Sequence, residues 1–113
     1  MQPLVKKTLE VAQEQIGIRE EGNNCGPEVR RYLASTGLGC GYPWCAAFVY
    51  WCVQEAATAL GENNPFIRTA GCAVIDSWAR TNNIREPRPK VGDVFLRRST
   101  VDGVYRASHT GFV

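Results

Sequence analysis

Cys45 lies where a loop rich in glycine and proline gives way to an apolar segment that is expected to be helical. The first turn of a helix presents unpaired backbone N–H groups and the positive end of the helix dipole. Both favour thiolate over thiol, and thiolate is the form of cysteine that attacks carbonyl carbons. His109 is the only histidine of the chain, so it is the one imidazole that could serve Cys45 as a base. The pair predicts a cysteine hydrolase.

A structural role for both residues is the competing interpretation. Free cysteines often act as small buried hydrophobes, and a single histidine is more often structural than catalytic. The order of the surrounding segments favours catalysis: the Trp-Cys helix start is followed by a Gly-Asp-Val-Phe-Leu segment at residues 92–96 and a His-Thr-Gly-Phe-Val segment at residues 109–113.

Further site residues are expected near Cys45. Its own backbone N–H, at a helix start, is a natural donor to an oxyanion. A second donor could come from Asn23, Asn24 or Tyr42, and the sequence does not choose among them. Trp44 could line the substrate groove or anchor the core.

The other cysteines raise the question of disulfides and metals. Apart from Cys45 there are four, Cys25, Cys40, Cys52 and Cys72, which could form two disulfides in three pairings or stay reduced. If one disulfide forms, we favour Cys25–Cys40, because both flank loops leading to the Cys45 helix. Cys52 lies two turns after Cys45 and is expected to be buried and inert. The chain has no C-x-x-C pair and no D-x-D-x-D-G loop, so no metal or other cofactor is expected.

The elements that must position these residues are helices first and strands last. Prolines suit helix starts, glycines suit helix ends, and Asp102-Gly103 is a hairpin turn sequence. Residues 44–53 are apolar on nearly all sides, which predicts a central buried helix. The sequence predicts helices at about 3–17, 27–36, 44–60 and 70–80, and strands at 94–97 and around Phe112.

Composition indicates one globular domain over residues 1–113, with 44% hydrophobic and 21% charged residues. The net charge of +2 is too small to argue for nucleic acid, and no stretch is long enough to span a membrane. Residues 1–17 contain charges and no continuous apolar segment, so they do not resemble a signal peptide. We therefore expect synthesis in the cytoplasm.

Three motifs carry a family resemblance: WCAAFV at residues 44–49, PKVGDVF at 89–95 and HTGFV at 109–113. Together they resemble the cysteine, histidine-dependent amidohydrolase/peptidase (CHAP) domains, which are related to NlpC-type and papain-like peptidases. The stretch EGNNCGPEV at residues 21–29 is similar to the phage and prophage endolysin-like branch. The resemblance implies a papain-like α+β fold, with amino-terminal helices packed on a carboxy-terminal antiparallel sheet. It also implies cleavage of peptidoglycan amide bonds by Cys45 as nucleophile and His109 as base, as an N-acetylmuramoyl-L-alanine amidase or a cell-wall endopeptidase.

The family resemblance leaves two alternatives open. One is a catalytically silent domain that binds peptidoglycan or a protein, and the other is an interbacterial toxin or acyltransferase that uses the same pair. Relatives commonly add a third polar residue on a strand after the histidine, whereas this chain has four residues beyond His109. We therefore expect a truncated sheet, reduced activity and self-association through the carboxy-terminal strand. Without a signal peptide, action on the cell wall would require release or secretion by another route.

Overall fold

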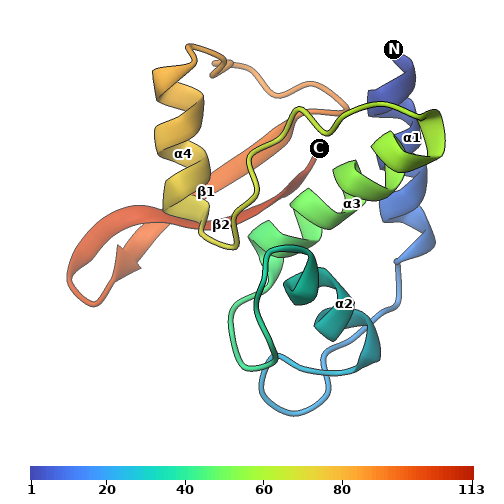
Figure 1. Ribbon diagram of the computed structural model, residues 1–113. Coiled ribbons are helices and arrows are strands. Elements are labelled where there is room, and N and C mark those ends of the chain that lie inside the picture. Colours follow the sequence, from blue (N-terminus) through green and yellow to red (C-terminus); the bar gives the residue numbers. More distant parts are fainter.

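The computed structural model describes residues 1–113 as four helices followed by one β-hairpin (Figure 1). This arrangement confirms the predicted α+β class. The elements are α1 (Pro3–Glu14), α2 (Pro27–Ser35), α3 (Cys45–Leu60), α4 (Cys72–Thr81), β1 (Val94–Val101) and β2 (Val104–Phe112).

The helix boundaries follow local chemistry, with small shifts from the sequence prediction. α1 ends at Glu14 rather than at Gly17, because the N–H of Gln15 turns back to the carbonyl of Ala12 and closes the helix early. α3 ends where Gly61 adopts a left-handed conformation with φ of 68°, which glycine tolerates. α4 begins at Cys72, two residues later than predicted, because Gly71 is still extended.

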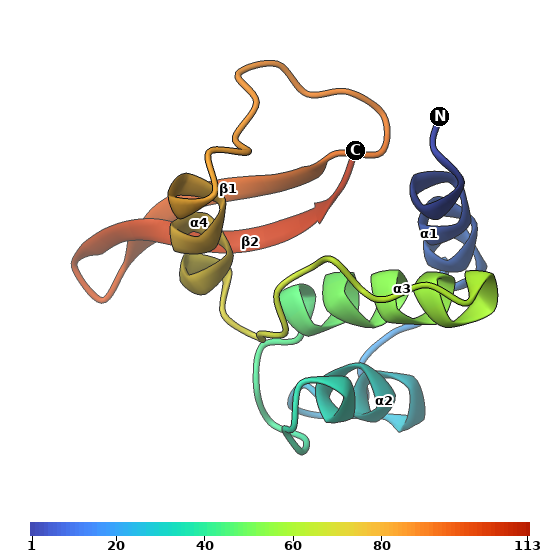
Figure 2. The same ribbon diagram turned by 45° about the horizontal axis from the view of Figure 1, so that its top comes forward.

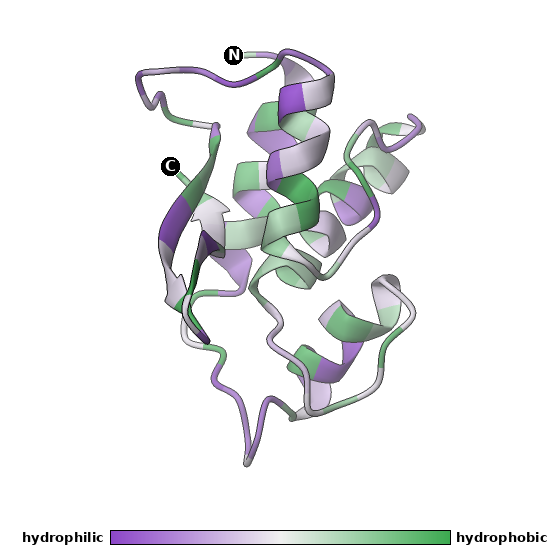
Figure 3. Cartoon of the chain, turned by 90° about the vertical axis from the view of Figure 1, so that its left-hand side faces the viewer, coloured by the Kyte–Doolittle hydropathy of each residue, from purple (hydrophilic) through white to green (hydrophobic).

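Helix α3 forms the centre of the molecule. Figure 2 shows it between α2 on one side and the hairpin with α4 on the other, while α1 packs across its carboxy-terminal half. Its small residues Ala46, Ala47 and Ala56 are fully buried and allow close approach of these neighbours. Figure 3 shows that hydrophobic residues predominate where the helices meet, and that hydrophilic residues are common on the loops. The predicted central position of this helix is therefore confirmed.

The hairpin is longer than the sequence analysis predicted. β1 and β2 pair in antiparallel register from Val94 opposite Phe112 to Val101 opposite Val104. Asp102 and Gly103 both have positive φ, at 51° and 77°, which matches the predicted two-residue turn. The β-branched residues near the turn support the extra length.

An irregularity interrupts the hairpin just before His109. Arg97 pairs with His109, but the next residue, Arg98, pairs with Ala107, so Ser108 is an extra residue on β2. Such a bulge bends the strand and changes the direction of neighbouring side chains. It therefore lies where it affects the orientation of the only histidine.

An ion pair joins α4 to the hairpin. The Arg98 Nη2 of β1 donates to both carboxylate oxygens of Asp76 on α4, at 2.8 and 2.9 Å. Arg80 contacts the same carboxylate at 3.1 Å. These contacts fix α4 against β1.

None of the four helices combines the length and apolar character that crossing a bilayer requires.

Candidate active site

A cavity of about 650 Å³ lies between the amino-terminal end of α3 and the carboxy-terminal half of β2. The segment that follows α1 supplies its third side. Four of the residues singled out from the sequence line this cavity: Cys45, His109, Trp44 and Asn24. The fold thus brings together residues that are up to 85 positions apart, from Asn24 to His109.

Cys45 is the first residue of α3 and is half-buried. Its Sγ lies 3.5 Å from the Sγ of Cys72, the first residue of α4. The hydrogen bond with Cys72 has the largest effect on the Cys45 thiol. With hydrogen bonds from the His109 side chain and the Thr110 backbone, it outweighs burial and lowers the pKa of Cys45 to about 5. The site therefore favours a thiolate at neutral pH.

The other free thiol of α3 has opposite properties. Cys52 is fully buried within the cluster that joins α1 to α3. Burial, and secondarily the charge of Glu55, raises the pKa of Cys52 to about 12. The expectation that this cysteine lies in the core is confirmed.

His109 is held in the cavity by β2 and by an aromatic neighbour. The ring of Phe95 on β1 meets the imidazole edge-on, with ring centroids 5.8 Å apart. Phe95 itself lies against Gly111, where a Cβ would come within 2.7 Å of the ring. A glycine at this position therefore leaves room for the aromatic ring beside the imidazole.

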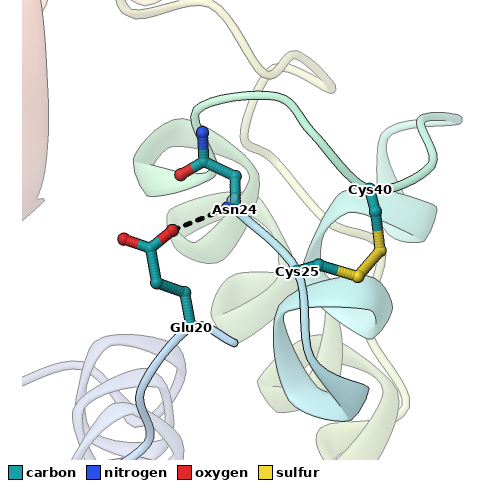
Figure 4. Close-up of a disulfide and its surroundings, with 4 residues drawn as sticks. All are labelled: Glu20, Asn24, Cys25 and Cys40. Carbon is teal, nitrogen blue, oxygen red and sulfur yellow. Dashed lines mark hydrogen bonds between the residues drawn. A yellow bond between two sulfur atoms is a disulfide. The ribbon is translucent and has the colours of Figure 1, made fainter. Parts of the chain in front are cut away.

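A disulfide-linked loop carries Asn24. The Asn24 N–H donates to Glu20 Oε2 at 2.7 Å, and its carbonyl accepts from the Gly41 N–H at 3.0 Å. Figure 4 shows the hydrogen bond between Asn24 and Glu20 beside the disulfide that joins Cys25 to Cys40. The favoured pairing is therefore confirmed, and it ties the Asn24 loop to the loop before α3.

The remaining candidates separate into two groups. Trp44 lines the cavity and also stacks on Tyr32, with ring centroids 5.6 Å apart, so it serves both the cavity wall and the core. Asn23 and Tyr42 do not line the cavity, and Tyr42 is 51% exposed. Of the three possible second oxyanion donors, only Asn24 faces the same space as Cys45.

Several cavity residues were missed from the sequence. Gln15 and Ile18 also line the cavity, and the Tyr32 hydroxyl donates to Gln15 Oε1 at 2.7 Å. Cys72 was treated only as a disulfide candidate. Cys72 is the first residue of a helix, as Cys45 is, and the preceding Gly71 marks this helix start in the sequence. That shared position could have drawn attention to Cys72.

No group of three or more His, Cys, Asp or Glu residues lies close enough together to hold a metal ion. Asp76, the most buried acidic residue, is engaged by Arg98 and Arg80.

A helical domain with a hairpin, and a cysteine at a helix start sharing a cavity with a histidine, is typical of cysteine amidohydrolases and peptidases. The sequence profile of the CHAP domain matches residues 37–113, which include Cys45 and His109. The chain therefore belongs to the CHAP domain family. No curated protein and no solved structure shows significant similarity to it. Membership of this family suggests peptidoglycan amidase or peptidase activity.

Proposed function

We propose that this protein hydrolyses amide bonds of bacterial peptidoglycan, as an N-acetylmuramoyl-L-alanine amidase or a cell-wall peptide endopeptidase. One observation carries the proposal: Cys45 begins α3 and lines the same cavity as His109. The His109 side chain is also among the groups that lower the pKa of the Cys45 thiol. The family assignment supports the same chemistry and substrate.

In the first half of the proposed reaction, the Cys45 thiolate attacks the carbonyl carbon and a carbon–sulfur bond forms. The carbonyl oxygen gains negative charge, which the Cys45 backbone N–H and the Asn24 side-chain amide stabilise. His109 holds the proton that the Cys45 thiol has lost, and it gives this proton to the leaving nitrogen as the carbon–nitrogen bond breaks. The amine product leaves, and the acyl group remains on Cys45 as a thioester.

In the second half, water attacks the thioester while His109 accepts its proton. The carbon–sulfur bond then breaks, which releases a carboxylic acid and restores the thiolate. The low thiol pKa suits Cys45 both as nucleophile and as leaving group at neutral pH.

Incubation with purified peptidoglycan, followed by mass spectrometry of the soluble products, tests the proposal. An amidase separates intact stem peptides from the glycan and exposes an amino-terminal alanine. An endopeptidase instead shortens or separates the stem peptides. Cys45→Ala and His109→Ala should each lower turnover by about 10³-fold or more. Cys52→Ala, which alters a thiol outside the cavity, is the matched control and should retain activity.

The result also discriminates between the alternatives. Peptidoglycan that is retained by the protein but not cleaved would support a silent binding domain. Transfer of an acyl group to an added amine, without net hydrolysis, would support an acyltransferase.

We also propose that the protein belongs to the phage or prophage endolysin-like branch and acts on the cell wall after release or secretion. The support is the segment at residues 21–29, which contains Asn24 of the cavity. Bacteriolysis by protein added from outside, and by protein co-expressed with a membrane-permeabilising partner, tests this use.

A further inference from the structure

Cys72 has no role in the proposed Cys–His reaction, yet it is the nearest sulfur to the nucleophile. It is 8% exposed and does not line the cavity. Its Sγ lies 3.5 Å from the Sγ of Cys45, and Cys72 belongs to a buried cluster against which Cys45 packs. The contact joins the first residues of two helices, α3 and α4.

Two sulfurs at this separation are most stable when they share one proton. Two neutral thiols form only a weak hydrogen bond, and two thiolates repel each other. One thiol donating to one thiolate gives a charge-assisted hydrogen bond, which is stronger than the neutral form. The amino-terminal ends of α3 and α4 both place unpaired N–H groups near this single negative charge.

The surroundings decide which sulfur keeps the proton. Cys45 is half exposed to the cavity and also receives hydrogen bonds from the His109 side chain and the Thr110 backbone. Cys72 is enclosed by the apolar residues Ala46, Ile75 and Ala107, where a charge is poorly solvated. The negative charge therefore belongs on Cys45, and Cys72 remains the donor.

We propose that Cys72 is a positioning residue that donates its S–H to the Cys45 sulfur and so holds the nucleophile as a thiolate turned toward His109. The inference deepens the proposed function and rests on Cys45 being the nucleophile. The titration of the two groups agrees with this assignment: their shared hydrogen bond is the largest cause both of the lowered pKa of Cys45 and of the raised pKa of Cys72.

The first test measures ionisation of Cys45 and does not depend on hydrolysis. The rate at which iodoacetamide alkylates Cys45 is followed against pH by peptide mapping in wild type, Cys72→Ala, Cys72→Ser and Cys52→Ala. Loss of the donor in Cys72→Ala should raise the pH midpoint of Cys45 alkylation by about one unit or more. At a pH below both midpoints, the variant then holds about tenfold less Cys45 thiolate than wild type. The Ser hydroxyl can still donate, so Cys72→Ser should recover part of the shift. Cys52→Ala should match wild type.

The second test needs no variant. Diamide removes two electrons and two protons from a pair of thiols, forms their S–S bond and is itself reduced to the hydrazine. At low concentration it should link Cys45 to Cys72 before any bond involving Cys52 forms, because only the first pair is adjacent. Mass mapping under non-reducing conditions identifies the bond. Failure to link this pair overturns the proposal, as does an unchanged alkylation profile in folded Cys72→Ala.

Measuring turnover on peptidoglycan in the same variants separates the two claims. If wild type cleaves peptidoglycan and Cys72→Ala leaves the alkylation profile unchanged, the hydrolase stands and the role of Cys72 fails. If the profile shifts but wild type shows no cleavage, the sulfur pair stands and the proposed function fails. With both correct, the pH dependence of kcat/KM in Cys72→Ala should shift in the same direction as alkylation.

Discussion

The surroundings of Cys45 favour its thiolate form, because three neighbouring groups lower the pKa of this thiol. The Cys72 thiol, the His109 side chain and the Thr110 backbone all stabilise the thiolate against the opposing effect of burial. Cys52, seven residues further along the same helix, lacks this set and is enclosed by apolar contacts. One helix therefore carries one thiol whose pKa is lowered and one whose pKa is raised.

This contrast predicts selective alkylation. Iodoacetamide should modify Cys45 with a rate that rises through about pH 5 and then levels off, because the thiolate is the reacting form above its pKa. Cys52 should remain unmodified throughout the neutral range, since its pKa is about 12. Peptide mapping after brief labelling measures both rates. As a control, the urea-unfolded protein should give midpoints near the ordinary value of about 8.5 for both thiols. Equal labelling of the two thiols in the folded protein would contradict the assignment.

Gly111 permits the arrangement around the histidine. A Cβ there would lie 2.7 Å from Cε2 and 3.0 Å from Cζ of Phe95, whose ring contacts His109. We expect Gly111→Ala to displace the ring, to destabilise the fold by about 1–3 kcal/mol and to lower turnover. Thermal unfolding and the peptidoglycan assay measure the two effects.

Two further variants control this prediction. Gly39→Ala adds a methyl group where no atom lies within 4 Å, so it should leave both quantities nearly unchanged. Phe95→Leu in the Gly111→Ala background should restore part of the stability, because the smaller side chain relieves the overlap. Additive losses in the double variant would show that the two residues do not interact.

At the residue scale, the sequence indicated those candidate site residues that lie in a recognisable local motif. It missed those that join the site only through tertiary contacts. Cys45 and His109 stood out because of a helix start and a strand motif, and Cys25–Cys40 because both flank loops. Cys72 comes next to the Cys45 sulfur, and Gln15 comes to the cavity wall, only after distant segments pack together. No local pattern contains that information.

Among the elements, α4 depends on an ion pair to hold Cys72 in place. Asp76 lies one turn after Cys72 on the same helix and is bound by Arg98 of β1. Burial alone would raise the pKa of Asp76, but hydrogen bonds from Arg98 and then Arg80 outweigh it and leave the pKa lowered. The pair thus couples the hairpin to the helix that carries the thiol donor.

Removing Arg98 should weaken this coupling. We expect Arg98→Met to reduce the free energy of unfolding by about 1–3 kcal/mol at neutral pH, because Asp76 keeps a buried charge with fewer donors. The lowered pKa means that the stabilisation is present above the unfolded pKa, about 3.9, and is lost as pH falls through the folded value. The difference from wild type should therefore shrink in acid. Urea unfolding at several pH values measures it. Arg106→Met, an exposed arginine on the same hairpin, is the control. A difference that does not change with pH would contradict this account.

The sequence predicted the existence and order of the elements well and their ends less well. Proline and glycine marked the starts and stops of α1, α2 and α3 to within a few residues. The strands were underestimated, because residues 98–106 are largely polar and look like a loop until they pair. The bulge at Ser108 had no sequence pattern, since it arises from the register between two strands.

Across the whole molecule, the cavity forms only because β2 returns against the start of α3. Its lining comes from residues between Gln15 and Phe48 and between Phe95 and Phe112, so both ends of the chain contribute to it. The order of the elements indicates that a sheet packs on α3. It does not indicate the angle between the strands and the helix, or how closely they approach. That placement depends on packing among Phe48, Phe112 and their neighbours, whose contacts are long-range.

The sheet itself predicts how copies of the protein behave together. With two strands, β1 and β2 each have one edge whose N–H and C=O groups face away from the partner strand. The hairpin tip adds exposed Val104 and Tyr105, whereas the exposed Arg97 and Arg106 place positive charge along the same strands. We propose that edge pairing between copies competes with repulsion between these arginines.

Self-association should therefore increase with salt, because the Debye length falls from about 30 Å at 0.01 M to about 8 Å at 0.15 M. Light scattering across this range, at several protein concentrations, measures the apparent mass. Tyr105→Lys adds charge and removes an exposed ring at the hairpin tip, so it should shift the protein toward monomer. Tyr42→Lys alters a comparably exposed tyrosine that lies outside the sheet, and it should behave as wild type. A monomer at every salt concentration would show that the strand edges do not pair, and association disrupted equally by both substitutions would place the contact elsewhere.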